Sequence, residues 1–196
     1  MGNQTCTQKL MSQHQKFELS VPVSEIDHAL GPAHAPVTLV EYGDFECPIC
    51  KQAAPAVKLM LKHFSGRLRV VFRHFPQEEV HPHALQAALA AEAVGGQGKF
   101  WLMHDLLFEN QSHLKPQHLR SYAEQLELDM VRFDADMEDE LYLQRVREHT
   151  ESGVLSGVRA TPTFFINGRI HDASFGMQSL MDGIDAALRT VPPSHK

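Results

Sequence analysis

The sequence predicts an α/β fold in which a sheet flanked by helices is interrupted by an all-helical segment. Two short apolar runs rich in β-branched residues, at 37–42 and 68–74, indicate buried strands, and an amphipathic helix at 50–64 separates them. A strand, a helix and a second strand joined by a right-handed crossover pair in parallel. From about residue 80 to 153 the pattern is helical, and a run of about 70 residues is too long for a simple connection. We therefore expect a helical subdomain inserted into the α/β unit.

Local signals predict the remaining elements. The inserted segment contains four amphipathic or alanine-rich stretches bounded mostly by glycine or proline, at 82–94, 100–109, 116–126 and 138–155. After it, residues 164–166 indicate a strand that leads into an Asn167-Gly168 hairpin turn, and residues 179–188 a final amphipathic helix. Near the N-terminus, residues 17–21 indicate a short strand that ends at Pro22.

These signals predict an order of domains along the chain. We expect an N-terminal tail with a short strand, a discontinuous α/β domain, a helical insertion and a C-terminal tail, at residues 1–28, 29–78 with 153–190, 79–152 and 191–196.

The motif Cys47-Pro48-Ile49-Cys50 lies where the first buried strand ends and the helix after it begins. Pro48 falls at the first helical position, where the fixed φ angle and missing N–H of proline are tolerated. A strand, a Cys-x-x-Cys turn and a helix in this order are typical of a dithiol redox site.

The start of a helix favours the thiolate of Cys47, because free backbone N–H groups and the helix dipole stabilise negative charge there. In such sites the thiol pKa falls from about 8.5 to roughly 3.5–7.5, and the thiolate is the attacking species in disulfide exchange. We expect Cys47 to be the nucleophile and Cys50, one turn further and more buried, to be the resolving thiol. Asp44 and Glu46 precede Cys47 and should oppose its ionisation slightly.

A Cys-x-x-Cys pair is also half of a zinc site. Zinc takes about four ligands, whereas the only other cysteine is Cys6 and no His-x-x-x-His pair follows at finger spacing. We therefore expect no metal, and we assign His81, His83 and His104 to helix-start and surface positions. Phe100 and Trp101 fit an apolar helix stripe and should pack in the core.

The cysteine motif carries a resemblance to a known family. Cys47-Pro48-Ile49-Cys50-Lys51, with Pro55 eight positions after Cys47, resembles the active-site helix of the thioredoxin superfamily. The stretches 31–50 and 95–108 resemble its DsbA-like branch, and the resemblance spans approximately residues 28–188. It implies a thioredoxin-like fold, with a central mixed sheet flanked by helices and an inserted all-helical subdomain.

The resemblance also implies a substrate-binding edge. Pro162 stands directly before a strand and resembles the cis-proline that faces the cysteines in this superfamily. A cis bond there would expose the backbone of Thr161 to an extended substrate peptide. We expect Pro48, Ile49, Thr161 and Pro162 to contact the substrate.

Glu41 interrupts an otherwise apolar strand six positions before Cys47. A buried carboxylate there would have a raised pKa. The resemblance matches Glu41 to the buried acid that helps to move the proton of the resolving cysteine. The alternative is a surface charge on an edge strand.

Composition limits the partners of the chain. A formal net charge of −6 argues against nucleic acid or an anionic membrane as the main partner, and no apolar run approaches the roughly 18 residues that span a bilayer. The first residues are polar and have no apolar signal core, so we expect a cytoplasmic protein, or a periplasmic or other extracytoplasmic one if a leader has been removed.

These observations predict a thiol–disulfide oxidoreductase that exchanges a redox-active Cys47–Cys50 disulfide with protein or peptide thiols, needs no cofactor and relies on a separate redox partner. Ile49 offers the thiolate neither charge nor hydrogen bond, which departs from the Pro-His of strongly oxidising DsbA proteins. Two alternatives stay open: a metal-binding module that uses the Cys-x-x-Cys pair, and a non-catalytic thioredoxin-like adaptor that binds peptides at the Pro162 edge.

Overall fold

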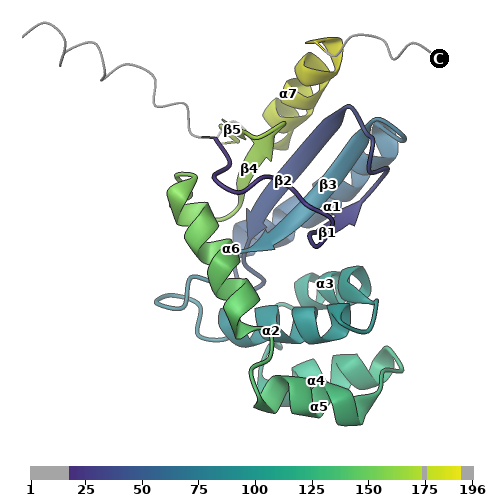
Figure 1. Ribbon diagram of the computed structural model, residues 1–196, viewed down its shortest axis with the longest axis vertical. Coiled ribbons are helices and arrows are strands. Elements are labelled where there is room, and N and C mark those ends of the chain that lie inside the picture. The colour runs from purple at the N-terminus through teal and green to yellow at the C-terminus, as the bar shows by residue number, and fades with distance from the viewer. Residues whose placement is uncertain (1–17, 174–175, 191–196) are drawn as a thin grey trace, which may run out of the picture.

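A computed structural model describes residues 18–173 and 176–190 of the chain (Figure 1). Its centre is a mixed sheet with the strand order β1-β3-β2-β4-β5. The strands are β1 His28–Leu30, β2 Val37–Gly43, β3 Leu68–His74, β4 Thr163–Ile166 and β5 Arg169–His171. β2 pairs in parallel with β3 and antiparallel with β4, so the strand that leads to the cysteines lies in the middle of the sheet.

The helices form two groups around this sheet. They are α1 Pro48–His63, α2 Ala84–Gly95, α3 Phe100–Glu109, α4 Pro116–Gln125, α5 Met130–Glu138, α6 Leu143–Leu155 and α7 Met177–Thr190. Helices α1 and α7 cover one face of the sheet, while α2 to α5 gather at the end of the molecule opposite α7 (Figure 1). Helix α6 leads from that end back along the sheet to β4. In 18–173 and 176–190, no helix has the length and apolar character needed to cross a bilayer.

The alternation of side chains along β2 separates two cores. Val37 and Leu39 pack with α1 and α7 on one face, and Val40 and Tyr42 pack on the other face, near α6 and the N-terminal segment. Glu41 follows the first set and therefore lies on the α1 face. A third core at the helical end contains both cysteines, so the motif lies where the sheet meets the helical layer.

The predicted helix at 138–155 is wrong at its start. Helix α6 begins only at Leu143, and a separate helix that the sequence analysis missed, α5, ends at Glu138. Glu140 lies between them with a φ of 48°, which interrupts helical geometry. The side chain of Asp129 caps α5 by accepting a hydrogen bond from the Arg132 N–H at 3.1 Å. The available sequence signal for this missed start was Asp129, an N-capping residue type directly before apolar Met130 and Val131.

The predicted strand at 17–21 is also wrong over its described part. Phe17 and Cys6 lie outside the described residues, and Glu18 makes only an isolated bridge to Arg169. Ser20 instead donates a side-chain hydrogen bond to the Ser152 carbonyl at 2.9 Å, which ties the segment to α6. The division into a discontinuous domain and an insertion stays a prediction, and α6 runs across its boundary at 152/153.

Candidate dithiol site

The N-terminus of α1 positions the two cysteines. Cys47 is the N-cap residue with extended backbone angles, φ −74° and ψ 122°, and Pro48 stands in the first helical turn as predicted. Pro48 and Ile49 are exposed, whereas Cys47 is 5% and Cys50 0% exposed. Both cysteines are free thiols in this structure.

The environment separates the acidity of the two thiols. The hydrogen bond from the Cys50 thiol is the largest influence on Cys47 and lowers its pKa to about 5. Hydrogen bonds from the Thr161 side chain and from the backbone N–H groups of Cys50 and Ile49 act in the same direction, against the effect of burial. Burial, and then the hydrogen bond to Cys47, raise the pKa of Cys50 far above its ordinary value. At neutral pH the pair therefore consists of a Cys47 thiolate and a Cys50 thiol.

Two acids hold the loop in front of the cysteines. The buried Asp44 carboxylate accepts hydrogen bonds from the Glu46 N–H at 2.7 Å and the Gln77 N–H at 2.9 Å, and pairs with His81 at 2.8 Å. Glu46 accepts from the N–H of His83 at 2.7 Å, at the start of α2. Neither carboxylate is among the main causes of the lowered thiol pKa, so their effect lies in loop geometry.

The helical end adds a contact that sequence reasoning missed. The Gln111 side-chain amide donates to the carbonyl of Phe45 at 2.9 Å and to that of Cys47 at 2.8 Å. It therefore ties the last loop residues before α1 to the segment that follows α3. A single glutamine between helices carries no motif, so the sequence had no signal for it.

Thr161 and Pro162 lie directly against the motif, as the resemblance implied. The Thr161–Pro162 peptide bond is cis. Sγ of Cys47 lies 3.2 Å from the Thr161 carbonyl oxygen, which accepts a hydrogen bond from it when Cys47 is a thiol, although the two residues are 114 positions apart. An open groove of about 460 Å³ begins here, and its lining includes Ile49, Thr161, Pro162, Ile170 and Met177.

Glu41 lies beneath the cysteines on the central strand, between Phe72 of β3 and Phe164 of β4. It is 3% exposed, which excludes the edge-strand alternative. Burial, and then the charge of Cys47, raise its pKa to about 8. In return, Glu41 contributes to the raised pKa of Cys50. The carboxyl group is therefore mostly protonated at neutral pH and electrostatically coupled to both sulfurs.

The prediction for His104 is wrong, since this side chain is only 5% exposed. Its ring packs against Phe45, Phe72 and Phe108, with centroid separations of 5.7, 4.9 and 4.9 Å. A neighbouring carboxylate, Asp105, pairs with its Nδ1 at 3.0 Å. Histidine in an apolar helix stripe was the available signal, and its polarity concealed its burial. Phe100 is buried as predicted, and Trp101 packs partly buried beside it.

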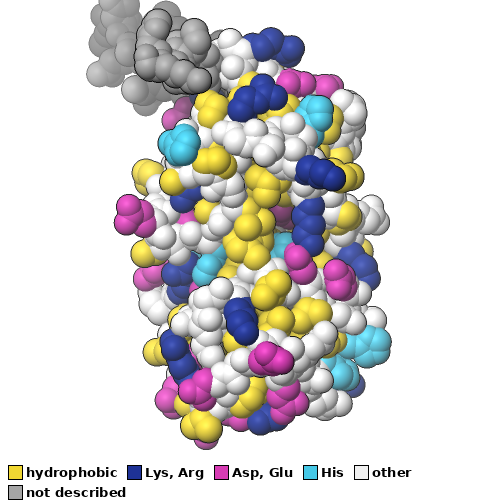
Figure 2. Space-filling model, turned by 90° about the vertical axis from the view of Figure 1, so that its right-hand side faces the viewer, with side chains coloured by type: hydrophobic (Ala, Val, Ile, Leu, Met, Phe, Trp, Pro, Cys, Tyr) yellow, Lys and Arg dark blue, Asp and Glu magenta, His cyan; other side chains and the backbone are white. Residues whose placement is uncertain are grey.

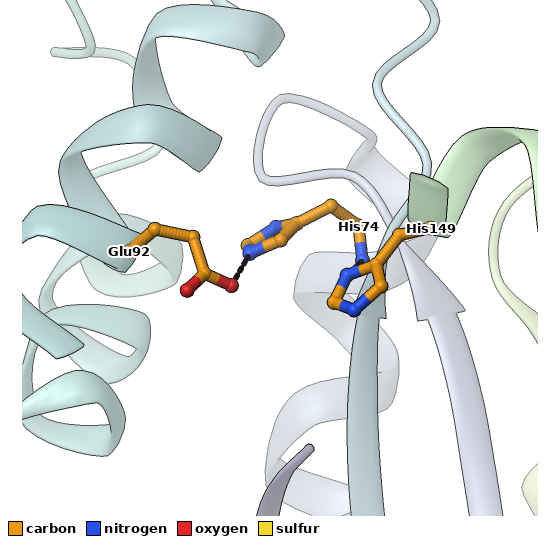
Figure 3. Close-up of side chains that lie close together, drawn as sticks. All are labelled: His74, Glu92 and His149. Atoms are coloured by element: carbon orange, nitrogen blue, oxygen red, sulfur yellow. Dashed lines mark hydrogen bonds and ion pairs between the residues drawn. The ribbon is translucent and has the colours of Figure 1, made fainter. Parts of the chain in front are cut away.

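One group of metal-type ligands occurs among the described residues (Figure 3). His74, Glu92 and His149 offer atoms that lie within 4.8 Å of one another, where α2 and α6 meet the end of β3. Glu92 already bonds His74 and His28, each at 2.9 Å, and forms an ion pair with Arg145 at 2.9 Å. Because a guanidinium neutralises the only carboxylate, we interpret the group as a polar link between the helical end and the sheet.

Comparisons with known proteins agree with this geometry. A family model described as Thioredoxin matches residues 24–186, and the chain belongs to this family. BdbD from Bacillus subtilis, in its oxidised form, is similar with a TM-score of 0.75 at 25% identity, over 83% of this chain and 93% of BdbD. The thiol-disulfide exchange protein alpha-DsbA2 from Wolbachia pipientis is similar with a TM-score of 0.72 at 19% identity, over 82% and 86% of the two chains. The expected thioredoxin-like fold and the DsbA-like branch are confirmed.

The curated relatives are named as ion antiporters, unlike the structurally similar proteins above. Na(+)/H(+) antiporter NhaA 1 from Salinispora arenicola (strain CNS-205) is 49% identical over 173 residues, which cover 88% of this chain and 26% of the relative. The chain thus spans about a quarter of the length of the curated relatives it matches. The antiporter name describes the whole relative.

Proposed function

We propose that the protein is a thiol–disulfide oxidoreductase that exchanges the Cys47–Cys50 dithiol with protein substrates through a mixed disulfide at Cys47. The observation that carries the proposal is the separation of the two thiol pKa values. Cys47, at about 5, is ionised at neutral pH, and Cys50 is held as a thiol beside it. Two cysteines with this difference are suited to successive roles as nucleophile and resolving thiol.

The first step is attack of the Cys47 thiolate on a substrate disulfide. A bond forms between Sγ of Cys47 and one substrate sulfur, the substrate S–S bond breaks, and the second substrate sulfur leaves as a thiolate. When the protein acts as an oxidant, the same bonds form and break in reverse order.

In the second step Cys50 attacks Sγ of Cys47 in the mixed disulfide. The Cys47–Cys50 bond forms, the remaining substrate sulfur leaves as a thiolate, and the proton of Cys50 has to be accepted nearby. Glu41 is the candidate acceptor, because its pKa of about 8 lies close to neutral pH. In the mixed disulfide Cys47 is uncharged, which removes the second cause of the raised Glu41 pKa and increases the ionised fraction of the carboxyl group that can accept the proton. Proton transfer works best when the pKa of the acid or base lies near the working pH.

The groove beside the motif is the proposed substrate site. Pro48 and Ile49 are exposed next to Cys47, and Thr161 with Pro162 forms the opposite rim. An extended peptide placed there would pair with the Thr161 backbone and rest its side chains on the apolar groove wall. The partners that follow from this reading are protein or peptide thiols and disulfides, together with a separate redox protein.

The test combines turnover with trapping. Wild-type protein should catalyse insulin reduction or dithiol oxidation, Cys47→Ser should abolish turnover, and Cys50→Ser should accumulate a mixed disulfide at Cys47. Cys6→Ser is the matched control and should keep full activity. If wild-type protein shows no turnover and Cys50→Ser traps no substrate, the adaptor reading replaces the proposal. Zinc that survives dialysis and is lost in Cys47→Ser would favour the metal-binding module.

The antiporter names of the curated relatives favour a second candidate function. The 49% identity raises the hypothesis that the dithiol reports redox state to an ion-transport protein. A partner of this kind would bind differently to the reduced and oxidised forms, and comparing the two forms in binding to the antiporter part of such a relative tests this. The cytoplasmic location stays a prediction, as does a redox potential less oxidising than that of Pro-His proteins, which equilibration with glutathione buffers measures.

A further inference from the structure

Glu41 has a buried oxygen that no other residue satisfies. Its Oε1 is buried and makes no hydrogen bond, although the side chain lies between two paired strands. Leaving a buried polar atom unpaired costs about 1–3 kcal/mol, so such atoms usually face water or a functional partner. The position of this oxygen therefore calls for a partner that the strands do not supply.

A small hollow lies beside this carboxyl group. It has a volume of about 20 Å³, and its polar lining consists of Glu41, Lys58 and His104, with Trp101 and aliphatic side chains of α1 and the sheet around them. About 10–15 Å³ is enough to hold one water molecule that has polar partners. On the face in Figure 2, hydrophobic side chains surround a hollow with acidic and histidine side chains in its depth. The hollow is therefore large enough for one water beside the acid.

His104 is oriented by a chain of charged groups that reaches the surface. Its Nδ1 pairs with Asp105 at 3.0 Å, and the second oxygen of Asp105 pairs with Lys58 at 2.6 Å. Burial lowers the pKa of His104, so its ring is neutral at neutral pH. A carboxylate only accepts hydrogen bonds, so Nδ1 carries the ring proton and Nε2 keeps a free lone pair. Asp105 is 32% and Lys58 49% exposed at the side chain, so the chain ends at solvent.

We propose that His104 carries protons between Glu41 and solvent across this hollow, while Asp105 holds its ring in the accepting tautomer. The inference rests on the proposed function. When Cys50 attacks the mixed disulfide, its proton passes to the Glu41 carboxylate. Glu41 then returns that proton through the water-sized hollow to Nε2 of His104, and the imidazolium, paired with Asp105, releases it to solvent.

This relay answers a need that the second step creates. Glu41 is 3% exposed and both cysteines are buried, so a proton taken from Cys50 has very little direct contact with bulk water. Without an exit, the acid would stay protonated and could not accept the next proton. The competing explanation is that His104 is a core residue satisfied by Asp105. The relay predicts that removing His104 slows the second step only when Glu41 is present. A packing role predicts a slowing that does not depend on Glu41.

The experiment isolates the second step. In the full chain carrying Cys6→Ser, Cys47 is converted at about pH 4 to its mixed disulfide with 2-nitro-5-thiobenzoate, and a jump to neutral pH starts release of the coloured thiolate by Cys50. General acid–base groups contribute roughly 10²–10⁴-fold, so we expect Glu41→Gln to slow release about 100-fold and His104→Phe about tenfold. The double variant should be no slower than Glu41→Gln alone. Exposed His34→Phe is the matched control and should release at the wild-type rate.

A second measurement separates proton transfer from packing. His104→Ala should be slow, and added imidazole should restore its rate in proportion to concentration, but should not speed Glu41→Gln. Three results would each overturn the relay. They are a wild-type release rate in His104→Phe, a double variant slowed by the product of the two single effects, and no rescue of His104→Ala by imidazole. Failure of the proposed function looks different: release from the wild-type adduct would then be as slow as release from Cys50→Ser.

Discussion

Replacing Glu41 by glutamine should make the protein more stable relative to wild type as the pH rises. The pKa of Glu41 is raised from an ordinary 4.5 to about 8 in the folded state. Below pH 4.5 the carboxyl group is protonated in both folded and unfolded chains, and its contribution to stability is complete. Between these values the unfolded chain ionises and the folded chain does not, so stability falls until the folded group also ionises.

The size of the loss in unfolding free energy follows from the shift of the Glu41 pKa on folding. One pKa unit corresponds to about 1.4 kcal/mol, so a shift from 4.5 to about 8 gives a loss of about 5 kcal/mol, as an upper bound, once the pH exceeds 8. Glutamine has nearly the same shape and does not ionise. The difference in unfolding free energy between wild type and Glu41→Gln should therefore decrease by up to about 1.4 kcal/mol per pH unit across this window.

Urea unfolding of the reduced proteins between about pH 5 and 8 measures this difference. Cys47 has the opposite dependence: its pKa falls from 9.0 to about 5 on folding, so it adds stability as the pH rises. Repeating the comparison of proteins with and without Glu41→Gln in a Cys47→Ser background removes the contribution of Cys47 ionisation from both unfolding free energies. The Cys47 charge is the second cause of the raised Glu41 pKa, so the slope should end at a lower pH there. A difference that does not change with pH would refute the assignment of Glu41 as a buried, mostly protonated acid.

Three further predictions concern the sulfur environment and the core. Alkylation of reduced protein by iodoacetamide should modify Cys47 with a half-maximal rate near pH 5 and leave Cys50 unmodified, and a midpoint near the ordinary 9.0 would contradict the lowered pKa. Thr161→Val should move that midpoint upward, because it removes a hydroxyl that stabilises the thiolate, whereas Thr161→Ser should not. Asp27 binds buried Arg73 through both oxygens at 2.8 and 3.0 Å, so Asp27→Asn should lower the unfolding free energy by about 3–5 kcal/mol. An unchanged urea midpoint would show that the guanidinium is satisfied without its counterion.

Sequence reasoning succeeded where the signal is local. The strands at 37–42 and 68–74 and the helix start at Pro48 match the structure within one or two residues. Alternation along β2 and the fixed φ of proline depend only on neighbouring residues. For Glu41 the sequence left a buried position and an edge-strand surface position open, and the structure decides for the buried one. The identity of the two cysteines as a pair required only the spacing of the motif.

Sequence reasoning failed where contacts between residues far apart in the chain decide the structure. The three-residue strand β1 exists because His28 to Leu30 pair with β3, and its own sequence has no strand pattern. His104 was placed at the surface because its side chain is polar, yet aromatic side chains from β3, α3 and the loop before α1 surround it. The Gln111 contacts to two active-site carbonyls join residues more than 60 positions apart. None of these can be derived from a window of sequence.

The position of the dithiol between two cores links its chemistry to the stability of the fold. Cys47 and Cys50 pack with the helical core, whereas most of α1 packs with the sheet. The same junction is crossed by Glu92 of α2, which bonds His28 and His74 of the sheet. A shift of the helical end against the sheet would therefore move the two thiols relative to Glu41 and Thr161 and break a buried carboxylate network at the same time. Because an unpaired buried charge is costly, this network resists the shift and keeps the distances on which the thiol pKa values depend.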